Sequence, residues 1–158
     1  MSSDQRTNYA GGIYGTIVSM AVIATSAKDP SLGPIMIAIW SAMTAVIFWL
    51  AHVYADIVAE GYTRFREAGD LARSALRREW PLVQGALIPS AAMLLTVITP
   101  MGTDSASWVA MVAGVAVLFT TGLMIGTRDS RPWGRRVTIG LINACFGLLI
   151  VGLKVWVH

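Results

Sequence analysis

Residues that can bind cations or exchange protons lie on one face of a predicted helix. His52, Asp56 and Glu60 follow one another at four-residue intervals, so they stack on the same side of an α-helix. Continued toward the N-terminus, this face covers a band of roughly 160° and becomes less polar. Its members are Ser41, Thr44, Phe48, His52, Asp56 and Glu60.

The chemistry that this face predicts is a path for a small cation or a proton. Asp56 and Glu60 would form an acidic mouth that concentrates cations, because carboxylate rings select cations in many pores. His52 would be a titratable group at its edge, and Phe48 a hydrophobic constriction. A chain of 158 residues encloses little volume, so we expect such a path to need a homo-oligomer with closed symmetry.

Other interpretations of the same residues stay open. His52 and Asp56 can pair locally at the membrane boundary, and nearby arginines can neutralise the carboxylates. A metal site is a weak possibility at His52 and Asp56, since the other histidine, His158, lies at the far end of the chain and a structural zinc needs four ligands. His52, oriented by Asp56, could act as a general base in an enzyme, but no nucleophile or cofactor motif accompanies the pair. We therefore expect neither an enzyme nor a cofactor.

The amino-acid composition indicates the class of protein in which these residues lie. Of the 158 residues, 55% are hydrophobic and 13% are charged, whereas soluble domains carry about 25% charge. The mean hydropathy is +0.62. The single cysteine, Cys145, excludes an internal disulfide. This composition excludes a soluble enzyme, a disordered chain and a disulfide scaffold, and it predicts an integral membrane protein.

Five apolar runs are each near the length of about 20 residues that a spanning helix requires. Because lipid supplies no hydrogen-bond partner, each run must be a helix, and the fold class is all-α. The runs are apolar all round, unlike the alternating strands of a membrane barrel. They form one transmembrane domain, residues 1–158, with runs at 11–27, 32–53, 81–101, 108–125 and 137–157.

The basic residues predict how the chain is oriented. Ten arginines lie in the N-terminal segment and in the connections between runs two and three and between runs four and five, while Lys28 and Lys154 lie on the other side. By the positive-inside rule the N-terminus is cytoplasmic and the C-terminus is outside. This arrangement suits a bacterial plasma membrane and explains the basic pI of about 9.4 without nucleic acid.

The connection at residues 54–80 is the one soluble feature. Its apolar positions follow a helical period that is interrupted at Gly69. We therefore expect the second helix to continue to about Ala68, and Asp70 to cap a short amphipathic helix that leads into Pro81. Whether this segment lies on the membrane or stands in the cytosol is left open.

Polar and small residues inside the runs predict helix packing. Gln84 and Asn143 are expected as interior polar groups that hydrogen-bond between helices. Pro89 is expected to free a carbonyl oxygen to which Ser90 or a neighbouring residue can donate a hydrogen bond. Lys154 is expected to extend toward the lipid headgroups. Small residues recur every four positions and permit close helix contact: Gly11, Gly15 and Ser19, then Ala110 and Gly114, then Gly122 and Gly126.

Together these patterns predict an oligomeric channel or transport protein for a cation or proton in the lipid bilayer, with its path along the second helix. The alternative is a non-catalytic accessory or assembly subunit of a larger membrane complex. No nucleotide-binding loop, nucleophile elbow or paired cysteine motif is present, and five runs do not favour an inverted-repeat transporter.

Overall fold

The computed structural model describes residues 3–60, 65–128 and 132–156, and this part of the chain is all-helical. Five helical stretches in it are long and apolar enough to span a membrane, which confirms that part of the prediction. The helices are α1 (Ser3–Ser26), α2 (Pro34–Glu60), α3 (Phe65–Arg78), α4 (Trp80–Leu95), the 3₁₀ turn η1 (Thr96–Ile98), α5 (Thr103–Arg128) and α6 (Trp133–Trp156).

The expected break at Gly69 is wrong, because α3 runs through both Gly69 and Asp70 without interruption. A glycine within a helix costs only about 1 kcal/mol, and α3 gains packing that offsets this cost. Ala75 of α3 is buried, and the indole nitrogen of Trp49 on α2 donates a hydrogen bond of 3.1 Å to the Leu76 carbonyl.

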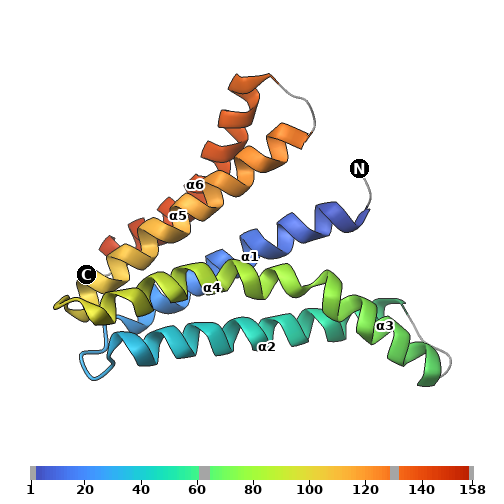
Figure 1. Ribbon diagram of the computed structural model, residues 1–158, viewed down its shortest axis with the longest axis horizontal. Helices are drawn as coiled ribbons and strands as arrows, with labels where there is room; N and C mark the ends of the chain where they lie inside the picture. Colours follow the sequence, from blue (N-terminus) through green and yellow to red (C-terminus); the bar gives the residue numbers. More distant parts are fainter. Residues whose placement is uncertain (1–2, 61–64, 129–131, 157–158) are drawn as a thin grey trace.

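The helices form two groups that meet at one end (Figure 1). α1, α2 and α4 lie side by side, while α5 and α6 form a hairpin that diverges from α1 toward the N-terminus. Where the groups meet, buried side chains from both form one core, among them Met20, Ile37, Met93, Met111 and Leu118. We call this the lysine end, since Lys28 and Lys154 lie there, and the opposite end, with α3 and the α5–α6 connection, the arginine end.

The closest contact in the fold is between the backbones of α1 and α4. A Cβ atom at Gly15 would overlap the carbonyl oxygen of Leu82, and one at Gly85 would overlap the carbonyl oxygen of Gly12. Only glycine fits where two helix backbones approach so closely. The small residues predicted to allow close contact on the first helix therefore make it within the chain.

The α5–α6 hairpin is packed by the same means. A side chain at Gly122 would meet the Gly140 backbone, and one at Gly126 would meet Arg136. Gly114, on another side of α5, contacts Met20 of α1. Glycines thus allow close packing between the two helices of the hairpin, and also between the hairpin and α1 of the first group.

We predict that Gly15→Ala destabilises the protein by about 1–3 kcal/mol or more, because overpacking would force α1 and α4 apart. The matched control is Gly152→Ala on α6, where an added Cβ meets nothing within 4 Å. There the gain in helix propensity should stabilise by about 0.4–1 kcal/mol. Unfolding in detergent micelles, followed by circular dichroism, measures both; equal stabilities would contradict the backbone contact.

Candidate functional site

A pocket of about 160 Å³ lies where α1, α2 and the start of α4 meet near the arginine end. Two of its lining side chains, His52 and Glu79, can exchange protons. Glu79 is the more enclosed, with 7% of its surface exposed. We call this the acid–histidine pocket; its lining residues are Ala10, Gly11, Tyr14, His52, Glu79 and Leu82.

His52 is held in place by its own helix and by α1. Its Nδ1 atom lies 2.8 Å from the Phe48 carbonyl oxygen, and its ring centroid lies 5.4 Å from that of Tyr14. Because a carbonyl only accepts hydrogen bonds, Nδ1 carries the proton that it donates. In the neutral ring, Nε2 is then the atom that can accept a proton.

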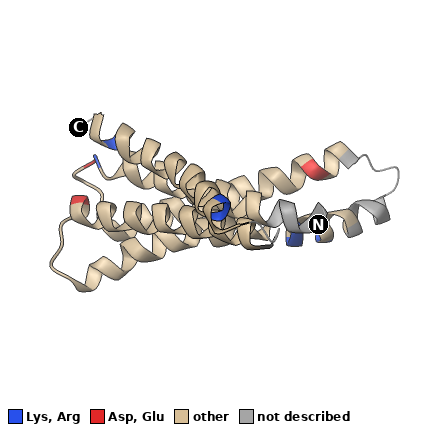
Figure 2. Ribbon diagram, turned by 90° about the horizontal axis from the view of Figure 1, so that it is seen from above, with Lys and Arg blue, Asp and Glu red and all other residues tan. Residues whose placement is uncertain are grey.

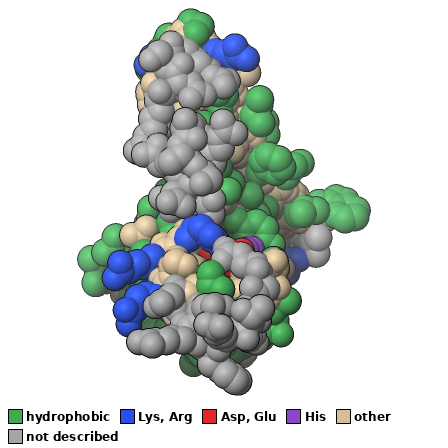
Figure 3. All heavy atoms as spheres, turned by 90° about the vertical axis from the view of Figure 1, so that its right-hand side faces the viewer, with side chains coloured by type: hydrophobic (Ala, Val, Ile, Leu, Met, Phe, Trp, Pro, Cys, Tyr) green, Lys and Arg blue, Asp and Glu red, His purple; other side chains and the backbone are tan. Residues whose placement is uncertain are grey.

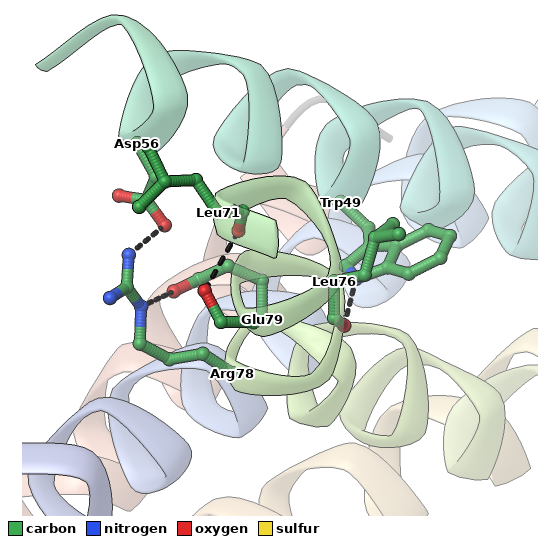
Figure 4. A network of polar contacts seen from close by, with 7 residues as sticks. Trp49, Asp56, Leu71, Leu76, Arg78 and Glu79 are labelled. Carbon is green, nitrogen blue, oxygen red and sulfur yellow. Dashed lines mark hydrogen bonds and ion pairs between the residues drawn. The ribbon is translucent and has the colours of Figure 1, made fainter. Parts of the chain in front are cut away.

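Arg78 connects two carboxylates beside this pocket (Figure 4). Its Nη2 atom lies 2.7 Å from Asp56 Oδ2, and its Nε atom lies 3.7 Å from Glu79 Oε1. A carboxylate withdrawn from water needs a positive partner, and Arg78 supplies one to both. Viewed from the arginine end, acidic and histidine side chains are visible close to basic ones (Figure 3).

A second polar cluster lies deeper, at the junction of α1, α2 and α4, and we call it the serine cluster. The Oγ atom of Ser41 lies 2.7 Å from Ser19 Oγ and 3.0 Å from Ser90 Oγ. Ser19 and Ser90 are 3.3 Å apart, and all three side chains are buried. Each helix of the group therefore contributes one hydroxyl to a closed set of hydrogen bonds.

Thr16 donates a hydrogen bond to the backbone carbonyl that lacks its helical N–H donor because of Pro89. Proline has no N–H, so the Gly85 carbonyl oxygen, four residues earlier, lacks its usual bond. The buried Thr16 hydroxyl donates to this oxygen at 3.1 Å and lies 2.9 Å from Gly12 O of its own helix. A neighbouring hydroxyl thus satisfies the carbonyl, but it comes from another helix.

An apolar layer separates the pocket from the serine cluster. Ala45, Leu82 and Ala86 form a fully buried cluster, and Trp49 packs against it. Leu82 also lines the acid–histidine pocket. The two polar regions therefore lie on the same helix junction, with a dry layer between them.

Part of the predicted face of α2 lies against other helices of the same chain, while Phe48 is partly exposed on that face. Ser41 belongs to the serine cluster, and Phe48 contacts Tyr14 with ring centroids 6.2 Å apart. His52 and Asp56 are at and beside the acid–histidine pocket. Thr44 instead donates to the Trp40 carbonyl of its own helix, and the Glu60 side chain lies outside the described residues.

The other predicted polar residues lie elsewhere. Gln84 is exposed and lines a separate pocket of about 200 Å³ between α1, α4 and α5. Asn143 sits beside Gly122 of α5 and donates to the Ile139 carbonyl of its own helix. In the described part of the chain, no three histidine, cysteine or acidic residues are grouped as a metal site.

Lys154 does not extend toward headgroups as expected. It is only 3% exposed and folds against α5, where its Nζ atom donates to Asp104 Oδ1 at 3.0 Å and to Ser107 Oγ. The same atom lies 4.7 Å from the centroid of the Trp108 ring. A charge-assisted hydrogen bond to a fixed partner outweighs the hydration that the headgroup region would provide.

Glu79 is the site residue that sequence reasoning missed. It directly precedes the third apolar run and follows two arginines, so it resembles a solvated loop charge. Glu79 lies between two helical segments, directly before Trp80 and Pro81. This position is the one feature of the sequence that could have indicated a buried site residue.

We predict that Thr16→Val costs about 1–3 kcal/mol of stability, because the Gly85 carbonyl would be left buried without a donor. The control Thr25→Val should cost less than about 0.5 kcal/mol, since the Thr25 hydroxyl is exposed and bonds only within α1. Chemical denaturation in micelles compares the two. A Thr16→Val variant as stable as Thr25→Val would show that the inter-helix bond contributes nothing.

The chain matches no protein-family model, and no curated protein or solved structure matches it. Its function is therefore inferred from its own residues.

Proposed function

We propose that this chain is a multi-pass membrane protein that moves protons across a bilayer, with His52 and Glu79 as the proton-loading pair. The observation that carries the proposal is their placement in one small pocket, with Glu79 only 7% exposed. Acidic and histidine side chains within membrane proteins commonly form proton relays. Histidine is suited to this role because its charge changes near neutral pH.

The charged groups around the pocket support proton loading. α1 contributes Tyr14, α2 contributes His52 and Asp56, the end of α3 contributes Arg78, and Glu79 precedes α4. A proton taken up by Glu79 removes one negative charge beside Arg78, which can then pair more fully with Asp56 at 2.7 Å. Loading is thus coupled to a change in the ion pairs between α2 and α3.

The serine cluster favours a proton over a metal cation as the transported species. Its three oxygen atoms are 2.7, 3.0 and 3.3 Å apart, so they occupy the space between the helices themselves. Hydroxyl groups in mutual hydrogen-bond contact can pass a proton by exchanging donor and acceptor roles. In the proposed mechanism, the layer at Ala45, Leu82 and Ala86 must admit water before a proton can pass.

The proposed path runs inside one chain, because Ser41 and His52 of α2 lie against residues of α1 and α4 of the same chain. A homo-oligomer in the lipid bilayer remains part of the proposal, with each copy holding its own path. The excess of arginine at one end supports a cytoplasmic location for the N-terminus and the acid–histidine pocket, in a bacterial plasma membrane. The pocket would then be loaded from the cytoplasm.

We predict that the purified chain in liposomes dissipates a pH gradient, reported by an internal pH dye. Glu79→Gln should slow this flux by about tenfold or more, since an amide cannot take up the proton. His52→Gln should also slow it. Asp29→Asn, which changes an exposed carboxylate at the lysine end, should leave the flux unchanged.

Folding of each variant is checked by its thermal unfolding before reconstitution. Folded variants that conduct like the parent chain would exclude the loading pair. Folded parent chain without flux in either orientation would overturn proton transport and favour an accessory subunit, for which co-purified partners would be sought in gentle detergent.

We predict the orientation from the same charge asymmetry. With Cys145 replaced by serine, a cysteine introduced at the exposed Ser31 should react with a membrane-impermeant maleimide on intact cells. A cysteine at the exposed Ser74 should react only after the cells are opened. The reverse pattern would place the acid–histidine pocket outside.

A further inference from the structure

A pocket of about 260 Å³ lies between α1 and α6 at the lysine end. Ala21 and Ala24 on α1 lie across from Ile150 and Leu153 on α6, and the small alanine side chains leave an apolar slot between the helices. The hydroxyl of Thr25 donates its hydrogen bond to carbonyl oxygens of its own helix, so it is not directed at a ligand in the pocket. The pocket is lined by Ala21, Ala24, Thr25, Lys28, Ile150, Leu153 and Lys154.

Both lysines of the chain line this pocket, although the chain holds ten arginines elsewhere. Figure 2 shows that charged residues gather toward the ends of the helices, and these two lysines lie at the same end. Lys28 is exposed and makes no ion pair with any described residue. Within the described part of the chain, a cation thus stands beside an apolar slot without a carboxylate that neutralises it.

Two carboxylates at the lysine end, Asp29 and Asp104, have other partners. Asp29 accepts hydrogen bonds from the Ser31 hydroxyl at 2.6 Å and the Ser31 N–H at 2.9 Å, and these bonds hold the pKa of Asp29 below its ordinary value. Asp104 pairs with Lys154 and does not line the pocket. The Lys154 ammonium has three N–H donors, of which Asp104 and Ser107 take two.

We propose that this pocket binds an anionic phospholipid, with one acyl chain in the slot and the headgroup phosphate at Lys28 and Lys154. Burial of an acyl chain contributes about 0.8 kcal/mol for each methylene group. The lysine ammonium groups would attract the headgroup phosphate, and a lysine near an anionic membrane surface contributes about 1 kcal/mol. Trp108 beside Lys154 is also suited to this depth, because tryptophan is enriched at membrane interfaces.

The experiment compares phosphatidylglycerol with phosphatidylcholine of the same acyl chains, added to the delipidated full chain and measured by native mass spectrometry. Phosphatidylglycerol should bind more tightly. Lys28→Gln should weaken its binding about fivefold, equivalent to about 1 kcal/mol for one lysine at an anionic surface. Lys28→Arg should retain binding, and Arg135→Gln, an exposed basic residue at the other end, should change nothing.

The acyl slot is tested separately with Ala21→Leu, which adds side-chain volume to the slot from an exposed position on α1. This variant should lose phosphatidylglycerol binding at least as strongly as Lys28→Gln, while Ala55→Leu, on the exposed side of α2, should bind like the parent chain. Equal binding of the two lipids by the parent chain, or unchanged binding in Lys28→Gln, would overturn the headgroup site. Unchanged binding in Ala21→Leu would overturn the acyl slot.

Discussion

The backbone contact between α1 and α4 is the constraint on which the rest of the structure depends. Gly15 on α1 meets the Leu82 backbone, and Gly85 on α4 meets the Gly12 backbone, with no space for a Cβ atom at Gly15 or Gly85. At this distance Thr16 reaches the Gly85 carbonyl that Pro89 leaves without a donor. The requirement for a glycine, a proline and a threonine at matching heights fixes how the two helices are aligned along their lengths.

That alignment determines where the polar residues of three helices meet. On one side of the contact, Ser19 and Ser90 are level with Ser41 of α2 and form the serine cluster. On the other side, the start of α4 brings Glu79 next to Tyr14 and His52. Leu82 belongs to both the contact and the apolar layer, so movement of α4 along α1 would alter the pocket and the layer together.

The sequence predicted the class of structure because composition and run length are properties of single segments. Each of the five apolar runs is near spanning length, so each predicts a helix without any knowledge of how the helices pack. The spacing of Gly11 and Gly15 predicted a close contact, but the partner depends on the alignment of two helices far apart in the chain. The same holds for the serine cluster: the sequence marks Ser19 as a small residue and Ser41 as part of a polar face, but their hydrogen bond depends on how the helices are aligned. Glu79 was missed since its burial results from the packing of α3 and α4 against α2.

The distance along the chain between the two sides of the glycine contact also sets a condition on biosynthesis. Thr16 and Gly85 are 69 residues apart, so at about 5–20 residues per second the ribosome needs roughly 3–14 s to make α4 after α1. During this interval the close contact between α1 and α4, including the hydrogen bond from Thr16 to the Gly85 carbonyl, cannot form. The Ser19–Ser41 bond joins residues only 22 apart, so it can form as soon as α2 exists. α2 can therefore hold α1 in place until α4 emerges.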